Sequence, residues 1–227
     1  MPDKTEGRLE TRAEAWARRS SKRSTVDFTM MYAAHDAFDR DLARLQDAVP
    51  KHSGAGTITA EMQAIWTMFA KQLHIHHTAE DEALWPRLAD AVADHTESGV
   101  LEAMELEHAG LNPMINDVND ALTAGDIATL ATGIAALRQG LSEHMAHEED
   151  TALPLVDNRL GQPGWDAFGK QIRQRVGGIA AGAQYLPWVL DGASDQVRTN
   201  ILAILPLPAR VLYRRVWEPK YRTAAHL

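Results

Sequence analysis

A short signature occurs twice in this chain: a histidine, a glutamate four residues later, and a proline ten residues after the histidine. One copy lies in HHTAEDEALWP and the other in HMAHEEDTALP. The two copies consist of His76, Glu80 and Pro86, and of His144, Glu148 and Pro154. Positions i and i+4 of an α-helix face the same side, so each copy directs an imidazole and a carboxylate to one point. We expect each proline to end its helix, because proline cannot donate the next backbone hydrogen bond.

Two further histidines, His35 in YAAHDAF and His108 in LEHAGL, lie in other stretches of helical periodicity. A lone histidine on an apolar face is usually a core residue, but four helices that each direct a ligand inward can build a two-metal centre. Without a cation, so many buried imidazoles and carboxylates would be costly to desolvate. The sequence therefore predicts a metal site made of His35, His76, Glu80, His108, His144 and Glu148.

The ligand types restrict the metal. The chain has no cysteine, which excludes disulfides, thiolate zinc sites and cysteine-ligated iron–sulfur clusters. Imidazole nitrogen and carboxylate oxygen suit iron, manganese or zinc. Six ligands are too many for one tetrahedral zinc ion, so we expect two ions that share both glutamates as bridges, about 3.5–4 Å apart.

The apolar periodicity predicts an all-α protein. Long helices are expected to begin near residues 25, 57, 96 and 125, and the first, second and fourth to end near residues 49, 85 and 153. Short loops between such helices favour an antiparallel, up-down-up-down four-helix bundle. Asn112-Pro113 predicts a kink or a restart in the third helix. We divide the chain into a polar N-terminal extension (1–24), the bundle (25–155) and a C-terminal helical appendage (156–227).

Charge is distributed unevenly along the chain. The net charge is +3 in residues 1–24, −16 in residues 25–155 and +5 in residues 156–227. The appendage is expected to contain short helices, one of them capped by Ser194, and to end in a basic, aromatic helix. This last helix is predicted to pack on the bundle, or instead to meet a protein partner or an anionic membrane surface.

Other classes find little support in the sequence. No apolar run approaches the length of a membrane span, and the polar N-terminus lacks a secretion signal, so a cytoplasmic location is expected. The chain has no glycine-rich phosphate loop and no G-x-S-x-G elbow. Neither basic end has the pattern of a nucleic-acid surface, so no nucleic-acid partner is expected. The oligomeric state is left open.

Several neighbours of the predicted ligands have open roles. His77 and Asp81 form a second histidine–carboxylate pair, one position out of register with the first. His147 could be a fifth imidazole or could hydrogen-bond to a ligand. Tyr32, one turn before His35, is expected to pack with its hydroxyl at the rim of the site.

The pattern H…HxxxE…H…HxxxE resembles that of hemerythrin-like proteins with HHE cation-binding domains. The resemblance covers about residues 25–155 and includes the closing LWP and LP. It implies an antiparallel bundle around a non-haem diiron centre, with two iron ions and an oxo or hydroxo bridge. Oxygen-carrying hemerythrins have a second histidine on the third helix, where this chain has Asn112. With one imidazole fewer, redox chemistry is favoured over reversible oxygen carriage.

Three functions are compatible with this reading. The first is a diiron protein that binds O₂, NO or peroxide in sensing or in the response to oxidative stress. The second is a catalase-like or peroxidase-like enzyme that decomposes hydrogen peroxide. The third is iron buffering by the acidic bundle. The appended C-terminal segment favours signalling or assembly over storage.

Overall fold

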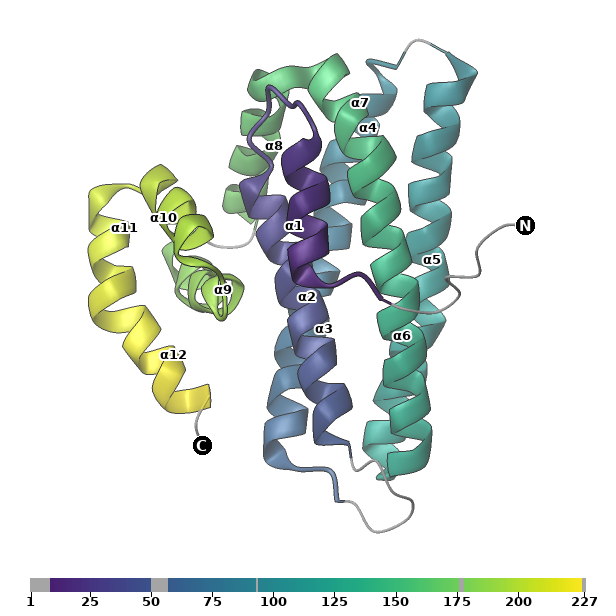
Figure 1. Ribbon diagram of the computed structural model, residues 1–227, viewed down its shortest axis with the longest axis vertical. Helices are drawn as coiled ribbons and strands as arrows, with labels where there is room; N and C mark the ends of the chain where they lie inside the picture. The colour runs from purple at the N-terminus through teal and green to yellow at the C-terminus, as the bar shows by residue number, and fades with distance from the viewer. Residues whose placement is uncertain (1–8, 50–56, 93, 176–177, 226–227) are drawn as a thin grey trace.

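The computed structural model describes residues 9–49, 57–92, 94–175 and 178–225. Its centre is formed by four long helices: α2 (Thr29–Ala48), α3 (Ala60–Ala79), α5 (His95–Ala124) and α6 (Ile127–His147). Helix α2 packs against α3 and α6, and α5 packs against α3 and α6, which closes the ring. Consecutive helices run in opposite directions (Figure 1). The predicted all-α, up-down-up-down four-helix bundle is confirmed.

Side-chain caps set the starts of three of these helices. The Thr59 side chain accepts a hydrogen bond from a backbone N–H at the start of α3, and Asp94 and Asp126 do the same for α5 and α6. Such caps satisfy backbone donors that have no partner within the helix. Gly125, at φ 70°, makes the left-handed turn between α5 and α6, a conformation that glycine adopts without steric cost. The tight α5–α6 hairpin is therefore encoded locally.

The prediction that Pro86 and Pro154 end their helices is wrong. Helix α3 continues through a π-helical turn, η1 (Glu80–Leu84), into α4 (Trp85–Ala89), and α6 continues through η2 (Glu148–Ala152) into α7 (Leu153–Leu155). The residue before each proline donates its N–H to the carbonyl of the motif glutamate, five residues back. The wider turn accommodates the proline ring without a break.

The structure also refines the prediction for Pro113. Helix α5 is assigned as one helix from His95 to Ala124, with this proline inside it, so the helix does not restart there. Helices α4 and α7, which follow the two motif copies, lie at the same end of the bundle (Figure 1). Both motif copies therefore lie toward one end, as expected.

Two apolar clusters fill the bundle, and the predicted ligands lie between them. One cluster includes Phe38, Leu73, Leu111 and Leu141. The other includes residues about two to three turns away along the same helices: Met31, Leu84, Met104 and Ala152. Along each of the four long helices and its continuation, the predicted ligands lie between a residue of the first cluster and a residue of the second. A polar layer thus crosses an otherwise apolar core.

The N-terminal extension contains a helix that the sequence did not lead us to predict. Helix α1 (Arg12–Ser21) begins with a capping box made by Thr11 and Glu14. It lies along the bundle surface beside α2 (Figure 1). The Trp16 indole donates to Asp36 on α2 at 2.7 Å. The extension is therefore attached to the bundle.

Part of the C-terminal appendage packs on α2 of the bundle, and its last helix packs on another helix of the appendage. After η3 (Val156–Leu160) and α8 (Gly161–Arg175), it contains α9 (Ile179–Leu190), α10 (Asp195–Ile204), α11 (Leu207–Leu212), η4 (Tyr213–Trp217) and α12 (Glu218–Ala225). Ser194 caps α10, as expected. The Trp188 indole on α9 donates to Asp41 on α2 at 2.6 Å, and Arg40 donates to the Trp188 carbonyl at 2.8 Å. None of the described helices is long and apolar enough to cross a membrane.

Candidate metal centre

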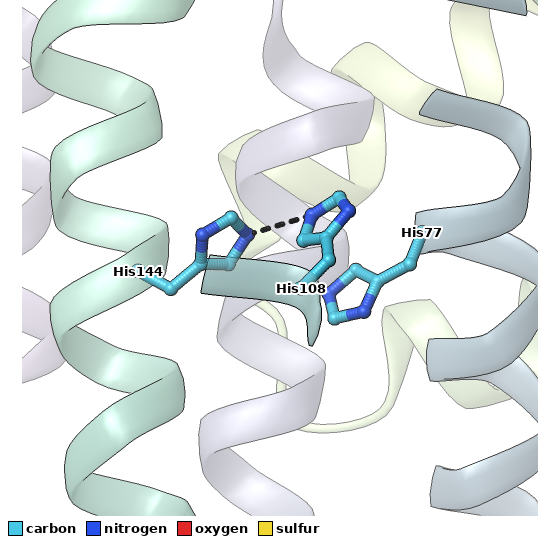
Figure 2. Close-up of side chains that lie close together, drawn as sticks. All are labelled: His77, His108 and His144. Atoms are coloured by element: carbon cyan, nitrogen blue, oxygen red, sulfur yellow. Dashed lines mark hydrogen bonds between the residues drawn. The ribbon is translucent and has the colours of Figure 1, made fainter. Parts of the chain in front are cut away.

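The polar layer contains two groups of potential metal ligands. His35, His76 and Glu148 form the first group, and His77, His108 and His144 form the second. Within each group, the ligand atoms lie within 4.8 Å of one another. Figure 2 shows the second group, in which three imidazoles from α3, α5 and α6 converge and the Nε2 atoms of His108 and His144 lie 3.1 Å apart.

Glu80 lies between the two groups. One of its carboxylate oxygens is 3.1 Å from Nε2 of His76, in the first group. The other oxygen is 3.6 Å from Nε2 of His108, in the second group. Glu148, in turn, lies 3.1 Å from Nε2 of His35. Glu80 is thus placed so that one carboxylate faces both groups of imidazoles.

Several donor atoms of this layer have no hydrogen-bond partner, and this tests whether a cation fits. Among the described residues, seven buried side-chain nitrogen or oxygen atoms have no hydrogen-bond partner. Six of them belong to the layer: Nε2 of His35, Nε2 of His77, and both oxygens of Glu80 and of Glu148. Both glutamates are fully buried. Since buried polar groups without partners are costly, a bound cation is the partner that this set of donors fits.

A second set of carboxylates orients the histidines. Nδ1 of His35 is 2.7 Å from Glu149, Nδ1 of His108 is 2.7 Å from Asp81, and Nδ1 of His144 is 2.8 Å from Glu107. When the ring is neutral and the carboxylate accepts its Nδ1–H, the Nε2 lone pair faces the centre of the layer. Carboxylate–histidine pairs of this kind fix ring orientation and make imidazole a better metal ligand.

These orienting carboxylates repeat along with the motif. Asp81 directly follows Glu80, and Glu149 directly follows Glu148. In each copy the following acid reaches a histidine on a neighbouring helix, which is one of the two lone histidines of the sequence. The motif is therefore His-x₃-Glu-acid, in which the glutamate faces inward and the next residue supports a ligand from another helix.

Burial sets the protonation of the other donors. Burial lowers the pKa of His76 and His77 well below the usual value, and neighbouring histidines add to this effect. Burial also lowers the pKa of His144. Neutral imidazoles are the form that binds metals. Burial raises the pKa of Glu80 well above its usual value, with a further contribution from the charge of Glu148.

His35 behaves differently from these histidines. Burial opposes its protonation, but the negative charges of Glu148 and Glu149 raise the pKa of His35 to about 9. Burial alone would raise the pKa of Glu149, yet hydrogen bonds from His35 and Arg19 hold it well below its usual range. A cation that enters the first group would replace the proton on His35 and would keep the charge of this buried cluster balanced.

Helix α1 closes the side of the layer next to His35. Arg19 donates twice to Glu149, at 2.7 and 2.9 Å, and once to Asp36 at 2.8 Å. Arg18 also donates to Glu149, at 2.8 Å. Arg19 and Glu149 are both buried, so this bidentate pair is shielded from solvent. An arginine from the N-terminal extension therefore holds the carboxylate that orients a predicted ligand.

The structure brings together all six residues that the sequence predicted as ligands. It adds His77 as a third imidazole of the second group. Five imidazoles therefore reach the layer, one more than the four that the sequence predicted as ligands. The sequence leaves the role of His77 open because it is out of register with His76. The sequence feature that points to His77 is its position directly after His76. Consecutive residues of one helix can face two different ligand groups.

The remaining neighbours lie outside the two groups. Nδ1 of His147 is 2.7 Å from Glu107, so His147 shares the carboxylate that orients His144. The side chain of His147 is 39% exposed. Tyr32 is half-buried, with the Arg19 guanidinium 4.8 Å from the centre of its ring. Burial raises the pKa of Tyr32 to about 12.

Comparison with known families gives one match. The family described as Hemerythrin HHE cation binding domain matches residues 26–156, which is more than half of the chain. No curated protein and no solved structure matches the chain. The matched range contains every residue of the two groups and Glu80, and it ends just after α7. The family description names cation binding, the chemistry that the orphaned donors require. The chain belongs to the hemerythrin HHE cation-binding domain family.

Proposed function

We propose that the bundle holds two iron ions, one in each ligand group, with Glu80 and Glu148 shared between them. The placement of Glu80 carries this proposal, because its two oxygens face imidazoles of different groups. Five imidazoles and two carboxylates without sulfur suit iron, which the family also supports. An oxo or hydroxo bridge between the ions would complete the centre that the resemblance implies.

The two groups differ in a way that favours binding of a small ligand. The first has two imidazoles and the second has three. With both glutamates shared, the iron of the first group would have one protein donor fewer. Bound iron at such a position supplies a redox-active centre with room for O₂, NO or peroxide. We propose that the protein takes up one of these ligands in sensing or in the response to oxidative stress.

Burial argues against iron buffering as the main role. Glu80 and Glu148 are fully buried, and His35 is almost so. Helix α1 further covers Glu149, the support of His35. A site that exchanges iron readily needs exposed donors, whereas a small uncharged or singly charged ligand can reach a buried centre. Catalytic decomposition of hydrogen peroxide is the alternative, and it uses the same centre.

The shared carboxylates can be tested by iron titration of the metal-free protein without oxygen. We expect about two irons per chain, and loss of about half or more of the iron in Glu80→Ala and in Glu148→Ala, because each carboxylate contacts both ions. Glu143→Ala is the matched control, since Glu143 lies on α6 but is exposed. Retention of two irons per chain in both glutamate variants would refute the shared arrangement.

Addition of hydrogen peroxide to the iron-loaded protein separates binding from catalysis. A stoichiometric change in the near-ultraviolet iron absorption, without sustained oxygen evolution, supports ligand binding and sensing. Sustained oxygen evolution supports the enzyme. A spectrum that responds to none of O₂, NO and peroxide contradicts both proposals and leaves the buffering role.

A further inference from the structure

An exposed apolar stripe runs along the outer side of the C-terminal appendage. Of the seven large hydrophobic residues that are exposed in the described part of the chain, five lie between residues 204 and 216. Leu207 is 71% exposed and Val211 is 58% exposed. Leu207 and Val211 are four residues apart. Val216 lies five residues after Val211, across the π-helical turn η4, which holds one residue more than a regular turn. The three side chains therefore share one face.

The opposite face of the same helix is the one that packs on the protein. Tyr213 is buried in the apolar cluster that also contains Phe38 and Leu73, and Trp217 is half-buried against this cluster. The hydroxyl of Tyr213 accepts a hydrogen bond from Arg198 at 2.7 Å. Helix α11–η4 is thus firmly attached through one side. Leu207, Val211 and Val216, which we call the outer stripe, remain exposed on the other.

Positive charge surrounds the outer stripe. Arg214 and Arg215 are exposed, and no acidic residue occurs from Leu205 to Trp217. Glu218, which follows, is bound by Arg198 at 2.7 Å and by Arg222 at 2.8 Å. The residues from Ile204 to Ala225 have a net charge of +4, in a chain whose total is −8.

A cavity of about 260 Å³ opens beside the stripe. Its lining includes Arg198, Arg210 and Arg214, against a single carboxylate, Glu218. Three guanidinium groups and one carboxylate give this cavity a positive balance, which suits a phosphate group. The cavity and the outer stripe share η4, so a ligand with both an apolar part and a phosphate could use both.

We propose that the outer stripe and its arginines form a docking surface for an anionic phospholipid bilayer. Leu207, Val211 and Val216 enter the boundary between headgroups and acyl chains, while Arg214 and Arg215 contact lipid phosphates. Pairing of the same face with a second copy is disfavoured, because a symmetric contact would oppose two sets of arginines. The short stripe predicts weak, reversible binding that depends on the lipid charge. This proposal does not depend on the metal centre.

The test is flotation of the full-length protein with lipid vesicles. We expect binding to vesicles of phosphatidylcholine with about 30% phosphatidylglycerol, at least about tenfold tighter than to phosphatidylcholine alone, and weaker binding at high salt. Arg214→Gln/Arg215→Gln should weaken binding by about 20-fold or more, since each basic residue contributes roughly fivefold. Leu207→Ser should weaken it by about tenfold.

Matched controls separate this surface from general effects. Leu106 on α5 is 73% exposed, so Leu106→Ser removes an equally exposed leucine elsewhere. Arg23→Gln/Lys170→Gln removes two exposed charges that lie outside helices α11, η4 and α12. Both controls should bind as the unaltered protein does, and all variants should melt at the same temperature. Equal binding to neutral and anionic vesicles overturns the proposal. An equal loss of vesicle binding in the control variants also overturns it. So does a protein that does not float with vesicles but self-associates, if Leu207→Ser abolishes the self-association.

Discussion

Replacement of Arg19 by glutamine should both destabilise the protein and weaken the site next to His35. Arg19 makes a bidentate contact with Glu149 and one hydrogen bond with Asp36. Removal of one partner of a buried ion pair usually costs about 3–5 kcal/mol. Arg18 and His35 still contact Glu149, so we expect a smaller cost than this, about 2–3 kcal/mol. For a chain of this size, that corresponds to a fall in Tm of about 5–10 °C.

Thermal unfolding of the metal-free protein, followed by circular dichroism, measures the first effect. Arg18→Gln is the matched control, because Arg18 lies on the same helix and contacts the same carboxylate but is partly exposed. A partly exposed pair is worth about 1 kcal/mol or less, so the control should lose only a few degrees. Arg19→Lys should fall between the two, because lysine keeps the charge but not the bidentate contact.

Iron affinity measures the second effect, which a purely structural arginine would not show. Loss of a group that supports a metal-binding histidine typically weakens binding by about 10–100-fold. We expect Arg19→Gln to weaken the iron of the first group by about tenfold and to leave the second group unchanged. If Arg19→Gln melts like Arg18→Gln, or if its iron affinity equals that of the unaltered protein, the inferred link from Arg19 through Glu149 to His35 is refuted.

Three further predictions concern other parts of the structure. His77→Ala should lower the iron content from two to about one per chain, whereas His74→Ala, on the exposed side of α3, should leave it unchanged by elemental analysis. Asp81→Asn should weaken iron binding less than Glu149→Gln, because Asp81 is 40% exposed and water can replace its carboxylate. A competition titration with a chelator measures both losses of affinity, and equal losses would contradict this reasoning. Burial would raise the pKa of Asp191, but its contacts with arginines of α2 lower this pKa. The carboxylate therefore stabilises the fold at any pH above the usual aspartate pKa, and this stabilisation is lost as the pH falls through the pKa of Asp191 in the folded protein. Asp191→Asn should therefore cost about 1 kcal/mol in urea unfolding at pH 7 and much less near pH 3, and a difference that grows in acid would contradict this.

Much of the bundle could be predicted because its signals are local. The caps at Thr59, Asp94 and Asp126 mark helix starts, and apolar periodicity marks the faces that pack. The six predicted ligands meet because each lies on such a face. Helix α1 escaped prediction because Arg18 and Arg19 attach it through ion pairs, which leave no apolar period in the sequence.

His77 escaped prediction for a geometric reason. The predicted site takes its α3 donors from one stripe of the helix, that of His76 and Glu80, and His76 and His77 point about 100° apart on a helix. The layer holds two ligand groups side by side, so both directions lead to a donor position. The orienting acids Asp81 and Glu149 were equally visible in the sequence, but their partners lie on other helices and only the fold reveals them.

The π-helical turns η1 and η2, which begin at the motif glutamates, have a consequence for how the bundle tolerates insertions and deletions. Each turn holds one extra residue between the motif glutamate and the proline, so the apolar residues beyond it, such as Trp85 and Leu88, reach the core although the segment is one residue longer than a regular helix. Deletion of one residue from Glu82–Ala83 would restore a regular helical ladder and leave the residues after it in the same phase, whereas the same deletion in a regular part of α3 would rotate them by about 100°. The local irregularity is what keeps the far end of the helix in phase with its neighbours.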